Sequence, residues 1–329
     1  MAVFLSTLSP MATLFFYIAI GFAVSKARIL PNEAGKVMAK METWIFCPAL
    51  SFITMVRYCT LDSLATHATN IVMAGISVII SMAIAIVLSR FFVRESNPER
   101  GVYKYALAFA NSGYVGDPIV LAVFGESALA YYKFYCLPLS FLIYTWGISV
   151  LTPGNEGKGS SLKRLFNPPT IAIFCGIIMG LLGLGDYLPT FIVSSLDALK
   201  SCMGPVAMLL AGITIARYDL LGMLKNKKVY LATALRLVVI PSVLIAVLFV
   251  IKTLAFSTFN ISIGTDVLFL CFFATATPLG LNTVVFPEAY GGNPEIGASM
   301  TMISHTLCVI SIPIMYAIMV AIFGTPFIT

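Results

Sequence analysis

Long apolar runs separated by short polar stretches dominate the chain. A helix needs about 20 predominantly apolar residues to cross the hydrocarbon core of a bilayer. The runs come close to this length ten times, so the pattern predicts an all-α protein with ten transmembrane helices. We place these spans at residues 9–25, 37–56, 68–92, 102–124, 127–150, 168–184, 191–216, 227–251, 264–287 and 296–323.

The fourth run contains a cluster of residues that interrupts its helical pattern. Asn111, Gly113, Gly116, Asp117 and Pro118 fall within eight residues. Proline has no N–H and clashes with the preceding turn, so Pro118 predicts a break near residues 116–117. Backbone that is freed at this depth is tolerated only where it faces protein or a water-filled cavity. The break therefore predicts a place where a solute is held.

The ninth run is interrupted in the same way. Residues 274–292 read ATATPLGLNTVVFPEAYGG, and Pro278 predicts the break. Because five spans form each half, the two halves must have opposite orientations in the membrane. Secondary transporters commonly consist of such inverted repeats, with the site at the repeat interface. We divide the chain into a first five-helix repeat (1–150), a cytoplasmic loop (151–167) and a second repeat (168–329).

Composition and charge agree with a membrane protein. Hydrophobic residues make up 59% of the chain, charged residues 10%, and the mean hydropathy is +0.97, whereas a soluble domain carries roughly 25% charge. With both termini outside, 15 of the 20 basic residues lie in cytoplasmic loops, as the positive-inside rule requires. Arg57, Lys133, Lys200 and Lys252 then fall outside, and Arg236 falls within a span.

The sequence offers no catalytic constellation and no metal or cofactor site. It contains no GxSxG, HExxH or Walker A motif, only two histidines, and seven cysteines without a CxxC pair. Basic residues at membrane edges give no support to nucleic-acid binding. We therefore expect a non-enzymatic protein whose partners are membrane lipid and a small solute.

At this point the motifs resemble those of the auxin efflux carrier family, the plant PIN-formed proteins and their bacterial relatives. The resemblance rests on NSGYVGDP (111–118), PLGLNTVVFPEAYG (278–291) and FCPAL (46–50). It implies a fold similar to that of bile-acid sodium symporters. Spans 1, 2, 6 and 7 would form a scaffold with a homodimer contact. Spans 3–5 and 8–10 would form a transport domain that moves like an elevator, with helices 4 and 9 broken and crossing.

Two features depart from the family pattern. The plant carriers have a long loop between spans 5 and 6, whereas this loop has about sixteen residues, as in the short bacterial form. Position 117 precedes the crossover proline, where the family leads us to expect an apolar residue, and this chain has Asp117. A carboxylate there would repel an organic anion unless it is protonated or paired with a cation.

We expect Asn111 and Asn282 to bind the solute, because an amide offers donors to a carboxylate and an acceptor as well. The alternatives are capping of the broken backbone by Asn111 and an inter-helix hydrogen bond by Asn282. Gly113, Thr277 and Gly280 complete the expected substrate site. The expected crossover residues are Gly116, Pro118 and Pro278.

Asp117, Arg236 and His305 are the candidates for binding a coupling ion or proton, since intramembrane ionisable residues suggest function. Asp117 would bind a proton or cation, or else cap a half-helix or pair with Arg236. Arg236 would bind an anion, pair with Asp117, or extend to the interface. His305 would relay protons or be a hydrogen-bonded core residue. Asp197 and Lys200 are expected to form an exposed ion pair.

The sequence thus predicts a multi-pass carrier that moves small carboxylates across the cytoplasmic membrane, either coupled to protons or as a uniporter. Dicarboxylates and aromatic acids both remain open as substrates. One alternative is a sodium-coupled symporter of bile-acid type. The other is a membrane sensor that binds the same ligand without moving it.

Overall fold

The computed structural model describes residues 2–94, 97–152, 166–260 and 262–324, and within these ranges it contains helices and no β-strand. The prediction of an all-α fold is confirmed to that extent. In the first half the elements are α1 (Ala2–Lys26), α2 (Ala34–Met41), η1 (Glu42–Phe46), α3 (Cys47–Tyr58), α4 (Leu61–Thr66), α5 (Ala68–Leu88), η2 (Ser89–Phe91), α6 (Glu99–Ala108), η3 (Ser112–Gly116), α7 (Asp117–Leu142), η4 (Ile143–Gly147) and α8 (Ile148–Leu151).

The second half begins after the predicted cytoplasmic loop, most of which lies outside the described residues. Its elements are α10 (Pro168–Leu181), η6 (Leu184–Tyr187), α11 (Thr190–Arg217), α12 (Leu220–Lys225), α13 (Lys227–Ala234), η7 (Leu235–Val239), α14 (Ile240–Phe259), α15 (Thr265–Ala276), α16 (Asn282–Tyr290) and α17 (Glu295–Phe323). The last predicted span, 296–323, coincides with α17.

Within the described ranges, five helical segments are long and apolar enough to cross a membrane, and shorter apolar helices accompany them. The long segments are Ala68–Phe91, Tyr131–Leu151, Thr190–Arg217, Lys227–Thr258 and Glu295–Phe323. The shorter ones are Met11–Lys26, Ser112–Gly125, Pro168–Leu181 and Thr265–Ala276. These helices support a multi-pass membrane protein. The ten-span inverted repeat remains a prediction.

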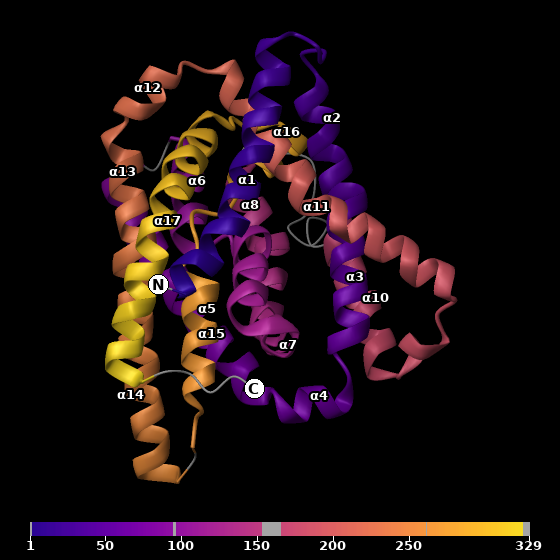
Figure 1. Ribbon diagram of the computed structural model, residues 1–329, viewed down its shortest axis with the longest axis vertical. Coiled ribbons are helices and arrows are strands. Elements are labelled where there is room, and N and C mark those ends of the chain that lie inside the picture. The colour runs from indigo at the N-terminus through magenta and orange to yellow at the C-terminus, as the bar shows by residue number, and fades with distance from the viewer. Residues whose placement is uncertain (1, 95–96, 153–165, 261, 325–329) are drawn as a thin grey trace.

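The helices pack in two groups. Helices α1, α3, α10 and α11 pack mainly on one another, and we call them the first bundle. Helices α5, α6, α7, α13, α14, α15 and α17 form the second bundle. Figure 1 shows α3, α10 and α11 on one side and α13, α14 and α17 on the other. Gly21 and Gly212 let the backbones of α1 and α11 touch, since a side chain at either would collide with the opposite helix.

The two interrupted helices cross at a short bridge. Helix α6 ends at Ala108 and η3 begins at Ser112, while α15 ends at Ala276 and α16 begins at Asn282. Between them, residues 110 and 279 form an isolated antiparallel bridge. The backbone N–H of Asn111 donates to the backbone carbonyl oxygen of Pro278 over 2.8 Å. We call residues 109–116 and 277–282 the crossover.

The break in the fourth span lies earlier in the chain than the proline predicted. Residues 116–118 are helical, and the chain is extended at Phe109. Pro118 lies in the first turn of α7, where a missing N–H is tolerated. The preceding wide turn of η3, in which the Asp117 N–H bonds to the Ser112 carbonyl, makes room for the proline ring. In the second half, the break does lie at Pro278.

Helix α7 reverses direction at Gly125. This glycine has φ 84° and ψ −175°, a conformation that other residues rarely adopt. The reversal brings the two arms of α7 together, and Lys133 of the second arm contacts Asp117 of the first. Asp117 and Lys133 are each eight residues from Gly125.

Candidate functional site

A cavity of about 70 Å³ lies where the crossover meets the first bundle. One water molecule needs about 10–15 Å³ of such space, so the cavity has room for several waters or a small solute. Its walls come from α3 and α11 of the first bundle and from α7, η4 and the crossover. The polar side chains among the lining residues are Ser51, Thr54, Asn111, Ser112, Tyr114, Asp117, Lys133, Ser140, Tyr144 and Asn282.

Asn111 lines this cavity and is held by His305. The Asn111 Nδ2 lies 3.1 Å from His305 Nε2, and His305 Nδ1 lies 2.8 Å from the Thr301 carbonyl oxygen. Because a carbonyl only accepts, Nδ1 carries the ring proton and Nε2 accepts from Asn111. His305 thus orients the asparagine, whose second amide hydrogen and Oδ1 remain for a ligand. This arrangement matches the core-histidine interpretation; a proton relay through His305 remains a prediction.

Asn282 lines the cavity from the other half of the crossover. Its Nδ2 donates to the Tyr105 hydroxyl over 2.9 Å, and its Oδ1 is buried without a partner. A flip of the amide would let Tyr105 donate to Oδ1 and would turn the amide hydrogens toward the cavity. The side chain can therefore present either an acceptor or donors to a ligand.

Asp117 is paired with a cation, and that cation is Lys133 rather than Arg236. Lys133 Nζ contacts Asp117 Oδ2, with side-chain exposures of 8% and 21%, respectively. Both residues line the cavity. From the sequence, Lys133 was expected among the outer charges, and its pairing with Asp117 was not predicted. Its position six residues inside a predicted span, together with its spacing from Gly125, could have revealed it.

Two features add positive charge near this pair. The helical segments that begin at Ser112 and Asn282 both start at its wall, and helix N-termini carry partial positive charge. Lys200 lies one turn from the lining residue Met203 on α11 and interacts electrostatically with Lys133 and Asp117. The combination suits an anion better than a cation.

Arg236 is buried away from Asp117. Its Nη1 donates to the carbonyl oxygens of Leu107 at 2.9 Å and Ala108 at 3.4 Å. These are the last carbonyls of α6, which the break leaves without helical partners. A guanidinium at a helix C-terminus is also favourable toward the helix dipole. The structure thus gives Arg236 a capping position, and its role in ion coupling stays untested.

The remaining predicted residues divide between cavity and packing. Gly113 and Gly280 line the cavity, and a methyl group on Gly113 would enter open space. Gly116 and Thr277 do not line the cavity and instead pack against each other beside Tyr132. Thr277 Oγ1 is buried without a hydrogen-bond partner. Of the five predicted substrate residues, Thr277 is therefore the one placed outside the cavity wall.

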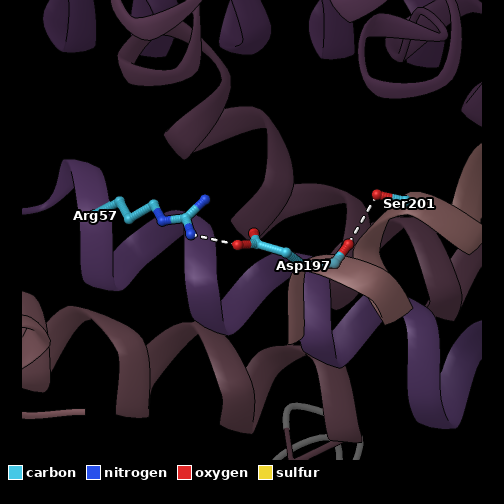
Figure 2. Close-up of polar contacts among 3 residues, drawn as sticks. All are labelled: Arg57, Asp197 and Ser201. Carbon is cyan, nitrogen blue, oxygen red and sulfur yellow. Dashed lines mark hydrogen bonds and ion pairs between the residues drawn. The ribbon is translucent and has the colours of Figure 1, made fainter. Parts of the chain in front are cut away.

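Asp197 forms an ion pair with Arg57 and not, as predicted, with Lys200. Asp197 Oδ2 binds Arg57 Nη2 at 2.6 Å, joining α3 to α11 (Figure 2). The side chains are 38% and 39% exposed. Asp197 and Lys200 share a helix face, but Arg57 reaches the carboxylate from the neighbouring helix, and Lys200 lies nearer the cavity.

An interrupted pair of helices around a polar cavity, in an apolar multi-pass fold, is typical of membrane transport proteins. A sequence model of the family described as "Membrane transport protein" matches residues 6–316. The chain belongs to this family, and the resemblance to the auxin efflux carriers is confirmed. It is a transporter and not an enzyme.

Two archaeal relatives support this assignment. The chain is 24% identical over 202 residues to an uncharacterized transporter of Methanocaldococcus jannaschii, covering 60% of this chain and 66% of that protein. It is 24% identical over 215 residues to an uncharacterized transporter of Methanothermobacter thermautotrophicus, covering 65% of this chain and 69% of that protein. The matches thus span about two thirds of these relatives.

Proposed function

We propose that this protein is a secondary transporter of small organic anions, and specifically of carboxylates. The observation that carries the proposal is the buried ammonium group of Lys133 in the wall of the cavity that Asn111 and Asn282 also line. A carboxylate bound there would receive amide hydrogen bonds and the charge of Lys133, with the two helix N-termini behind it. Asp117 holds Lys133 in place when the site is empty, and on substrate binding the Lys133 ammonium group exchanges Asp117 for the substrate carboxylate.

Alternating access would come from movement of the second bundle against the first, in the elevator manner that the family resemblance implies. The cavity lies between the two bundles, so such a movement would carry it toward one side of the membrane or the other. The first bundle would remain fixed and provide a homodimer contact. We place both termini outside the cytoplasmic membrane.

Thermal stability with added ligands tests the proposal. The purified protein is heated with a panel of mono-, di- and aromatic carboxylates, with and without sodium, at two pH values. A ligand that binds the folded state adds to the free energy of unfolding by mass action, about 2.7 kcal/mol at one hundred times Kd, and so raises the melting temperature. Asn111→Ala should lose this response, while Thr253→Ala, on the exposed face of α14, should keep it.

Flux into liposomes then separates a carrier from a sensor. A carboxylate that stabilises the protein should cross the bilayer only with wild-type protein present. Binding without flux would support the sensor alternative. If only neutral or cationic compounds stabilise the protein, the anion assignment is wrong.

A sodium-coupled symporter is the second candidate, because buried oxygens near the crossover lack partners. Asp117 Oδ1, Thr277 Oγ1 and Asn282 Oδ1 are buried without hydrogen bonds, and sodium prefers oxygen ligands. Lys133 opposes this interpretation, since its ammonium group already holds the Asp117 carboxylate. Stabilisation by sodium alone would favour the symporter.

A further inference from the structure

A second carboxyl group, Glu42, is buried beside the crossover and belongs to none of the sites described above. It lies in η1, a wide helical turn between α2 and α3, and its side chain is completely shielded from solvent. The Tyr114 hydroxyl donates to Glu42 Oε1 over 2.8 Å. Glu42 Oε2 has no hydrogen-bond partner. Tyr114 itself lines the cavity.

The groups that face Glu42 are all neutral at ordinary pH. They are Tyr114 from η3, the Cys47 thiol at 3.9 Å from α3, and Tyr144 from η4. On the other helices packed against η1, Arg217 of α11 and Glu288 of α16 bind each other at 3.0 Å. The other charged residues of α11, Asp197 and Lys200, lie toward the start of that helix, where Asp197 binds Arg57. The lysines of α2 are exposed. Glu42 therefore differs from Asp117, which is paired with Lys133.

An ionised carboxylate without a counter-charge is strongly disfavoured in a low-dielectric interior, and such a group takes up a proton instead. A protonated carboxyl also suits this site, because its carbonyl oxygen can accept from Tyr114 while its hydroxyl carries the proton. Eight residues separate Glu42 from the start of α2, which corresponds to about 12 Å along the helix. The proton is thus held within the membrane but near its predicted cytoplasmic side.

We infer that Glu42 is a proton-binding site that couples protonation to the position of the crossover relative to the first bundle. Glu42 is continuous with α3 of the first bundle, whereas Tyr114 belongs to the crossover. Movement of the second bundle would break the Tyr114–Glu42 hydrogen bond and admit water to the carboxyl group. The proton would then pass from Glu42 to water and leave a hydrated carboxylate. This coupling rests on the carrier function proposed above, whereas the protonation itself does not.

The first test measures thermal stability against pH without any carboxylate ligand. The folded protein holds a proton that the unfolded chain releases above the ordinary glutamate pKa of about 4.3, so its stability should fall as pH rises from mildly acidic values through neutral. Glu42→Gln keeps an acceptor for Tyr114 but cannot ionise. Over this pH range its melting temperature should fall by several degrees less than that of the wild type. The exposed Glu33, directly before α2, provides the control, because Glu33→Gln should retain the wild-type slope.

An unchanged slope in Glu42→Gln would overturn the assignment of a bound proton. Infrared spectra offer an independent check, since the band of a protonated carboxyl should be present in the wild type and lost in Glu42→Gln. Persistence of the whole band in the variant would also overturn it.

The second test measures flux in liposomes under a pH gradient. Glu42→Gln should keep the stabilisation by carboxylates but lose most of the flux response to the gradient. An unchanged response would refute coupling through Glu42 and point to Asp117. If no carboxylate is transported at all, the carrier proposal and the coupling both fail, while the pH-dependent stability still decides whether Glu42 holds a proton.

Discussion

The ion pair between Asp117 and Lys133 gives the sharpest prediction, because its two members are buried to different degrees. The Lys133 side chain is 8% exposed and that of Asp117 is 21% exposed. Breaking a buried pair by removing one partner costs about 3–5 kcal/mol of stability. Replacing both partners by uncharged residues can leave the stability almost unchanged. Asp117→Asn leaves the more deeply buried charge alone and should cost more than Lys133→Met.

The assay is a double-mutant cycle of thermal stability. If each kcal/mol shifts the melting temperature by about 2–4 °C, Asp117→Asn should lower it by roughly 10 °C. The Asp117→Asn, Lys133→Met double variant should recover most of that loss. The exposed pair Arg57–Asp197 serves as the control, because such pairs contribute only about 0–1 kcal/mol.

The same variants test whether Lys133 binds the substrate. In Asp117→Asn the ammonium group lacks a partner, so a transported carboxylate should stabilise this variant more than the wild type. Lys133→Met should lose carboxylate binding. A coupling energy near zero would refute the idea that the pair is structurally important. Full carboxylate binding by Lys133→Met would refute its role in recognition.

Three further predictions follow from single contacts. Gly113→Ala adds a methyl group that meets no atom within 4 Å, so it should leave the melting temperature nearly unchanged while reducing flux of the larger substrates in a size series. Arg236→Met removes charged hydrogen bonds worth about 1.5–3 kcal/mol each and should lower the melting temperature strongly. Arg236→Lys should lower it less, and an equal fall in the two variants would contradict the capping role. Gly212→Leu should prevent stable folding, measured as monodisperse yield, because the backbones of α1 and α11 could not touch; normal yield would contradict that packing.

Much of the fold could be predicted because the apolar runs and the prolines act locally. The predicted span 37–56 lies within one helical segment of residues 34–58, and the break at Pro278 lies where the sequence placed it. The break in the fourth span could not be placed, because a tertiary contact decides it. Residues 110 and 279 pair there, and a wide turn absorbs Pro118.

The site was only partly predictable, for a related reason. Asn111 and Asn282 could be singled out because amides are rare within an apolar run and lie beside the breaks. Lys133 and Glu42 lie in segments whose pattern is otherwise ordinary. Their importance depends on partners distant in the fold: Lys133 meets Asp117 across the reversal at Gly125, and Glu42 meets Tyr114 from a different span.

The two carboxyl groups next to η3 have opposite surroundings, and this contrast suggests how their roles are divided. Asp117 and Lys133 both belong to α7, so movement of the second bundle would carry both without separating them. The hydrogen bond from Tyr114 to Glu42 joins the crossover to the segment containing α3. Of these two contacts, the Tyr114–Glu42 hydrogen bond is the one that the movement would break. Glu42 can therefore respond to the position of the second bundle, whereas the Asp117–Lys133 pair cannot. Substrate charge would therefore be balanced within the moving part, and the proton would be bound at its boundary with the fixed part.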